Sequence, residues 1–181
     1  MRVITGTARG RKLKEPKNYD IRPTTDMVKE TVFNILQFDI EGRRMLDLFS
    51  GTGQMGIEAL SRGAAYVTFV DSAAESLRLT KDNLKTVGFE DRAEVIGADS
   101  IAFLKGCGKY DIIYIDPPYR SNLAQKALET INEFDILKEN GIIICESMYP
   151  SDMPELSAPY KKIRERKYGK ILITQYTKET E

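Results

Sequence analysis

The fold follows from one stretch of the chain, residues 44–56, which read RMLDLFSGTGQMG. Its first part, Arg44–Phe49, is a short apolar run that predicts a β-strand. Three glycines follow within six residues, Gly51, Gly53 and Gly56. Glycine adopts backbone conformations that a Cβ forbids, so this spacing predicts a tight turn into a helix. The free amides at the start of such a helix favour a polar or negatively charged ligand group.

Similar units lie on both sides of this stretch. Further strands are predicted at residues 66–70, 93–97, 110–115 and 142–146, a first helix at about 25–38, a later helix at about 121–137, and a β-hairpin at 161–176. This alternation predicts an α/β fold with a mostly parallel sheet, to which the hairpin adds antiparallel strands. Ser72 and Glu75 are predicted to form a capping box for the helix after the second strand.

The 181 residues suit one domain. We predict a basic N-terminal extension, residues 1–22, followed by the main domain, residues 23–181. No apolar run reaches the roughly 20 residues of a membrane span. With two cysteines and no histidine, the sequence predicts neither a disulfide framework nor a metal site. The expected location is the cytoplasm, with both thiols reduced.

The formal net charge of zero hides a segregation of charge along the chain. Residues 1–22 carry seven basic and two acidic side chains, and residues 160–178 carry seven basic and one acidic. The body between them is acidic. Basic ends around an acidic body suggest contact with a polyanion, although a solvated surface would show the same pattern.

The glycine loop alone leaves two cofactor classes open. Gly51, Gly53 and Gly56 match the dinucleotide fingerprint, and Asp71 lies 20 residues after Gly51, where such folds bind ribose hydroxyls. Asp47 precedes the glycines, and its carboxylate suits the ammonium group of S-adenosylmethionine but repels a pyrophosphate. These residues therefore favour S-adenosylmethionine over a nicotinamide cofactor.

A third acid, Asp99, follows the third strand and could accept a hydrogen bond from an adenine amino group. Each acid alone could simply cap a helix, but three at the carboxyl ends of successive parallel strands indicate one ligand crevice.

The chemistry is predicted at Asp116-Pro117-Pro118-Tyr119, directly after the most apolar strand. The prolines stiffen the loop and aim two acceptors, the Asp116 carboxylate and the Pro117 carbonyl, at one NH₂ group. An exocyclic base amine is a poor nucleophile, and two acceptors on its hydrogens leave its lone pair directed at a sulfonium methyl group. Positioning supplies most of the rate. Tyr119 offers a stacking face for a base that is flipped out or unpaired.

Together these motifs resemble the class I amino-methyltransferases that carry an aspartate- or asparagine-Pro-Pro-aromatic string. Two N-terminal strings extend the likeness, residues 2–13 (RVITGTARGRKL) and residues 22–34 (RPTTDMVKETVFN). They resemble the bacterial 16S rRNA guanine-N2 methyltransferase family (RsmD-like), over nearly the whole chain. Departures are Ala8 and Met27, where the family often has a large residue and an arginine.

The resemblance implies a Rossmann-like fold with a seven-stranded sheet and a reversed final hairpin. It implies S-adenosylmethionine as methyl donor and a guanine N2 in 16S rRNA, within a small-subunit particle, as acceptor. RNA contacts are implied for Arg9, Arg11 and Lys12. Cofactor contacts are expected from Arg22, Thr24, Asp47, Phe49, Ser50, Gly51, Gly53, Gly56, Asp71, Ser72, Asp99 and Ser100.

Three alternatives stay open at this point. The catalytic string also fits an N6-adenine or N4-cytosine methyltransferase, because all three targets are planar NH₂ groups. A nicotinamide-dependent oxidoreductase and a non-catalytic RNA-binding factor on the same fold are the others.

Overall fold

The computed structural model describes residues 1–17 and 24–180. Its centre is a seven-stranded sheet in the order β3-β2-β1-β4-β5-β7-β6. The strands are β1 (Arg44–Leu48), β2 (Tyr66–Asp71), β3 (Ala93–Gly97), β4 (Tyr110–Ile115), β5 (Leu137–Met148), β6 (Tyr160–Tyr168) and β7 (Ile171–Lys178). Strands β1 to β5 pair in parallel, and β7 is antiparallel to both β5 and β6. The expected sheet with its reversed C-terminal hairpin is confirmed.

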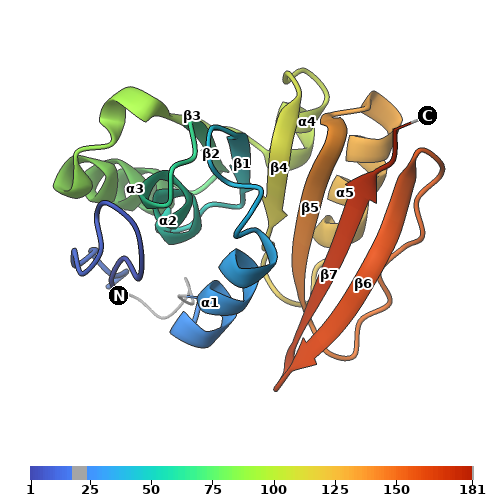
Figure 1. Cartoon of the computed structure of the whole chain (residues 1–181), viewed down its shortest axis with the longest axis horizontal. Helices are drawn as coiled ribbons and strands as arrows, with labels where there is room; N and C mark the ends of the chain where they lie inside the picture. The colour runs from blue at the N-terminus through green and yellow to red at the C-terminus, as the bar shows by residue number, and fades with distance from the viewer. Residues whose placement is uncertain (18–23, 181) are drawn as a thin grey trace.

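Helices cover both faces of the sheet. One core contains side chains of α1 (Asp26–Ile35), α2 (Gln54–Ser61) and α3 (Ala74–Val87), and the other contains those of α4 (Ser100–Leu104) and α5 (Leu123–Phe134). A short 3₁₀ helix, Glu90–Arg92, leads into β3. Figure 1 shows α5 behind β5 and β7, with α1 on the opposite side. None of the helices within the described residues is long and apolar enough to cross a membrane.

The central strand shows why the sheet is buried on both sides. Along β4, Ile112 and Tyr114 enter the first core, whereas Ile113 and Ile115 enter the second. Alternate side chains of a strand point to opposite faces, so a strand between two helical layers is apolar at nearly every position.

The predicted capping box at the start of α3 is wrong. The helix begins after Ala73, which has no side-chain cap, and the Ala73 N–H donates to Asp71 Oδ1 at 2.9 Å. The helix starts one residue later than the capping box requires, so Ser72 precedes the N-cap position instead of occupying it. Strand β5 also begins earlier than predicted, because Leu137 pairs with Tyr110 of β4.

Residues 1–17 form an N-terminal segment that packs on α2 and α3. Val3, Ala8 and Leu13 are buried in the first core. An antiparallel bridge joins Arg2 to Lys12. The segment therefore shares the hydrophobic core of the domain while its charged side chains stay on the outside.

Candidate active site

One cavity of about 620 Å³ opens at the carboxyl ends of the parallel strands, within the usual size range for a small-molecule site. Many residues predicted from the sequence line it: Thr24, Asp47, Phe49, Ser50, Gly51, Asp71, Ser72, Asp99, Ser100, Asp116, Pro117, Pro118 and Tyr119. They come from separate parts of the chain because parallel strands place all their carboxyl ends at one edge of the sheet. Arg22 lies outside the described residues.

Asp47 lies near the end of β1 and is almost completely buried. Its Oδ2 accepts the Gly56 N–H at 3.0 Å. Burial raises the pKa of Asp47 to about 8, and the neighbouring charge of Asp71 adds to this. Gly56 is needed here, because a Cβ at this position would lie 2.2 Å from the Phe69 ring. A cationic ligand in the cavity would favour the ionised form of Asp47.

We expect Asp47→Asn to stabilise the ligand-free protein increasingly as the pH rises. Below about pH 8 folded Asp47 is protonated, whereas the unfolded chain releases that proton near pH 4. Between these two pH values folding therefore takes up a proton. This lowers the free energy of unfolding by up to about 1.4 kcal/mol for each unit by which the pH rises. The asparagine carbonyl can still accept the Gly56 N–H. Urea unfolding at pH 5 and pH 7 measures the effect.

Asp99→Asn is the matched control, since Asp99 is exposed and asparagine caps a helix equally well. If Asp47→Asn gained the same free energy of unfolding over the wild type at pH 5 and at pH 7, the burial argument for Asp47 would be contradicted.

Two further carboxylates are held by backbone amides. Asp71 accepts the N–H of Gly51 and of Ala73, both at 2.9 Å. Asp99 Oδ1 accepts the Ala102 N–H at 2.8 Å and caps α4. In each case at least one lone pair remains for a ligand. Asp99 therefore caps α4 and also lines the cavity, whereas Asp71 lines the cavity and holds the glycine loop without capping α3.

The glycine loop shapes the wall between these acids. Phe49 has φ of 64°, in the left-handed region that non-glycine residues seldom adopt. Gly53, with φ of 77°, is the N-cap of α2, where a Cβ would contact Thr80 at 2.8 Å. Neither Gly53 nor Gly56 lines the cavity. Both instead allow α2 to approach α3 and β2 closely, which brings its N-terminus to the cavity.

The Asp116–Tyr119 loop follows β4 and forms another wall of the cavity. Burial raises the pKa of Asp116 well above its usual range, and the charges of Glu146 and Asp47 raise it further. Tyr119 Oη lies 3.4 Å from Glu146 Oε1 and donates to it. The loop thus presents an acceptor, a buried proline and an aromatic ring to one space.

Two residues of this wall were not selected from the sequence. Glu146 of β5 is buried and accepts a 2.6 Å hydrogen bond from the Tyr114 hydroxyl of β4. A small pocket beside the main cavity is lined by Glu146, Asp116 and Tyr119. Glu146 directly follows the apolar run of residues 142–145 near the end of β5, so the rule that selected Asp47, applied to the fifth strand, would have found it.

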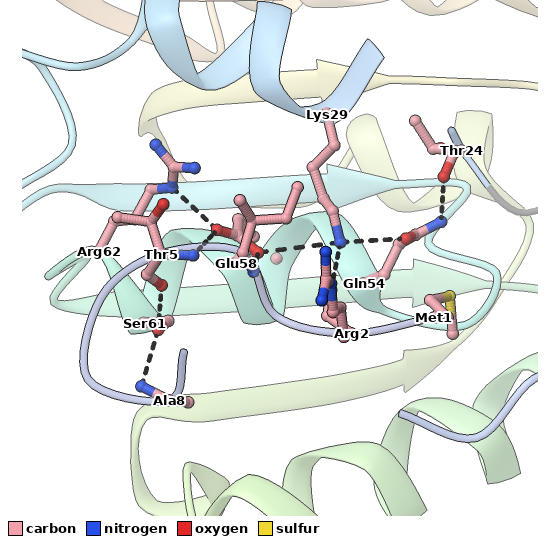
Figure 2. Close-up of polar contacts among 12 residues, drawn as sticks. Met1, Arg2, Thr5, Ala8, Thr24, Lys29, Gln54, Glu58, Ser61 and Arg62 are labelled. Carbon is pink, nitrogen blue, oxygen red and sulfur yellow. Dashed lines mark hydrogen bonds and ion pairs between the residues drawn. The ribbon is translucent and has the colours of Figure 1, made fainter. Parts of the chain in front are cut away.

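A buried polar network ties the cavity to the N-terminal segment (Figure 2). Lys29 Nζ donates to the Arg2 carbonyl at 2.7 Å and to Gln54 Oε1 at 3.4 Å. Gln54 Nε2 donates to the Thr24 carbonyl at 3.3 Å, and both residues line the cavity. Burial lowers the pKa of Lys29, and the charge of Glu58, 3.8 Å away, partly opposes this.

Residues 1–177 match the family model described as conserved hypothetical protein 95. The chain belongs to this family. It is 35% identical to ribosomal RNA small subunit methyltransferase D of Escherichia coli (strain K12), over all of this chain and 91% of that protein. The Haemophilus influenzae protein of the same name is 40% identical over 81% of this chain and 78% of its own length.

Solved structures agree with the sequence matches. The Escherichia coli protein yhhF superposes with a TM-score of 0.90 at 32% identity, covering all of this chain and 99% of that one. The family resemblance read from the sequence is therefore confirmed, and with it the Rossmann-like methyltransferase fold.

The basic residues singled out in the N-terminal segment of this family member lie on its surface. Arg9, Arg11 and Lys12 are exposed and lie outside the cavity wall. The Arg11 guanidinium donates to the Thr86 carbonyl of α3 at 3.4 Å. Thr52 of the cavity donates to the Met1 sulfur at 3.6 Å, so the segment starts next to the cavity.

Proposed function

We propose that this protein transfers a methyl group from S-adenosylmethionine to the exocyclic N2 amino group of a guanine in 16S rRNA. The observation that carries the proposal is the Asp116–Tyr119 loop in the wall of a cavity lined by Asp47, Asp71 and Asp99. The names of the Escherichia coli and Haemophilus influenzae relatives support small-subunit rRNA as the substrate.

The cavity suits S-adenosylmethionine by its charge and by its acceptors. The cofactor carries an ammonium and a sulfonium group. Burial raises the pKa values of Asp47 and Asp116, and a bound cation would stabilise the ionised form of both carboxylates. Asp47 would hold the ammonium group, Asp71 the ribose hydroxyls and Asp99 the adenine amino group. The remaining contacts would come from Phe49, Ser50, Gly51, Ser72, Ser100 and Thr24, together with Arg22, which lies outside the described residues. When bound, the cofactor supplies an electrophilic methyl group.

The residues after β4 prepare the acceptor nitrogen. The Asp116 carboxylate and the Pro117 carbonyl would each accept one hydrogen of the guanine NH₂, which directs its lone pair away from them. Pro118 keeps the loop stiff, and the Tyr119 ring would stack on the base. A carboxylate with a raised pKa is a better proton acceptor, so Asp116 also suits removal of the proton released on methylation.

The substrate is expected to be a small-subunit ribosomal particle in the cytoplasm. In the proposed division, residues 1–22 bind RNA and residues 23–181 form the methyltransferase domain. Three side chains of the N-terminal segment, those of Arg9, Arg11 and Lys12, would contact RNA phosphates. The segment that carries them is itself packed on α2 and α3.

Labelled methyl transfer tests this function. Small-subunit particles that lack the modification are incubated with the protein and labelled S-adenosylmethionine, and the RNA is digested to nucleosides. The expected product is N2-methylguanosine. Label in N6-methyladenosine or N4-methylcytidine would keep the chemistry and reject the acceptor. Cofactor binding without transfer would favour the non-catalytic factor, and tight nicotinamide binding by isothermal titration would favour the oxidoreductase.

A further inference from the structure

The end of the hairpin where β6 turns into β7 carries positive charges that form no ion pair with the described residues. The turn cluster consists of Tyr149, Arg166, Lys167 and Lys170, all exposed. Within residues 1–17 and 24–180, no ion pair involves Arg166, Lys167 or Lys170.

The opposite end of the same hairpin is different. Lys161 pairs with Glu179 at 3.1 Å, and Lys178 pairs with Asp135 at 2.7 Å. The hairpin therefore has one end whose lysines are paired with acids and one end whose basic side chains face solvent.

An aromatic ring is fixed to this positive end. Tyr149 is 47% exposed, and Lys167 Nζ lies 4.0 Å from its ring centroid, within cation–π range. The Tyr149 N–H donates to the Lys170 carbonyl at 2.8 Å. Two contacts thus hold the tyrosine to both sides of the turn.

The turn cluster adjoins the proposed base site. Ile171, the residue after Lys170, lines the small pocket together with Asp116, Tyr119 and Glu146. In Figure 1 the end of β6 and the start of β7 lie at the lower edge, the edge toward which β4 also points. Tyr149 is the third residue after Glu146, which corresponds to about 10 Å of extended chain.

We propose that the turn cluster binds the single-stranded RNA that flanks the target nucleotide. The proposal rests on the proposed function, since a base turned into the cavity leaves its neighbouring phosphates at the mouth. Arg166, Lys167 and Lys170 bind those phosphates, and the Tyr149 ring stacks on an adjacent base. Repeated phosphates with alternating π faces are the chemistry that basic and aromatic side chains together recognise.

Filter binding to deproteinised 16S rRNA tests this over a range of salt concentrations. The double variant Lys167→Ala/Lys170→Ala is expected to bind at least about tenfold more weakly. Its slope of log affinity against log salt should be shallower by about 1.4, the value for two lost phosphate contacts on a single strand. Tyr149→Ala should also bind about tenfold more weakly but with an unchanged slope, whereas Tyr149→Phe should bind like the wild type.

The matched control is Lys105→Ala/Lys161→Ala, which removes two exposed lysines far from the turn and should bind like the wild type. Equal affinity and slope for the turn and control variants would overturn the proposal. Methyl transfer by the wild type is read separately. If the wild type transfers methyl groups but the turn variants bind RNA normally, only the role of the turn cluster is rejected. If the turn variants bind RNA more weakly but the wild type transfers no methyl group, only the proposed function is rejected.

Discussion

The variant Asp116→Ala is expected to lose at least about 10²-fold in the rate of methyl transfer, the usual effect of removing one positioned polar group from an active site. One of the two acceptors on the amine disappears, and the nitrogen is no longer held with its lone pair directed outward. Affinity for S-adenosylmethionine should change by less than about tenfold, because Asp47, Asp71 and Asp99 remain. Single-turnover transfer and isothermal titration measure the two quantities.

Unfolding does not explain such a loss. Burial and two nearby acids raise the pKa of Asp116, so its charged form is costly in the folded state and alanine should not lower the melting temperature. Asp116→Asn is the matched variant, because its side-chain carbonyl keeps one acceptor, and it should lose less activity than alanine. If cofactor binding disappeared together with transfer, Asp116 would belong to the cofactor site instead.

The variant Glu58→Ala is expected to lower the free energy of unfolding by about 3–5 kcal/mol, the cost of removing one partner from a buried ion pair. Glu58 is fully buried and accepts the Ile4 and Thr5 N–H groups at 2.8 and 2.9 Å. It also accepts Arg62 Nε at 3.0 Å and lies 3.8 Å from Lys29 Nζ. Alanine leaves two amides unpaired and the buried ammonium without its counter-charge. Urea unfolding measures the loss.

Two companion variants show whether the buried pair is responsible. The double variant Lys29→Met/Glu58→Ala should lose less free energy of unfolding than the two single variants added together, because removing both charges leaves no buried charge unpaired. Glu30→Ala, an exposed acid on the same helix as Lys29, should change stability by no more than about 0.5 kcal/mol. If Glu58→Ala lowered the free energy of unfolding as little as Glu30→Ala does, the N-terminal segment would not be anchored through Glu58.

Much of the fold could be predicted because its signals are local. Strand β1, the glycine loop and α2 follow from residues 44–56, and the apolar run before Asp116 predicts a strand buried on both faces. The predicted helix boundaries were less accurate. The sequence suggested a helix to about residue 38, but α1 ends at Ile35, since apolar spacing continues past the last helical residue.

Much of the candidate site could be predicted for the same reason. The four acids Asp47, Asp71, Asp99 and Asp116 each lie at or near the carboxyl end of a strand, and parallel strands bring such positions together. The residues that were missed interact across long sequence separations. Lys29 and Glu58 look like surface charges on amphipathic helices, and only the packing of residues 1–17 over α2 buries them.

The sequence alone therefore determined the strand order along the chain, the glycine turn and the identity of the acids at the strand ends, because these depend on neighbouring residues and periodicity. Tertiary structure decided which of the charges are buried and which of them are paired. Burial of Asp47 raises its pKa, and the Tyr114 hydroxyl donates to Glu146. Lys178 pairs with Asp135, whereas Lys167 and Lys170 have no ion-pair partner in the part of the chain that the structure describes. The physical reason is that desolvation and Coulomb energy depend on distances between segments, which no local pattern encodes.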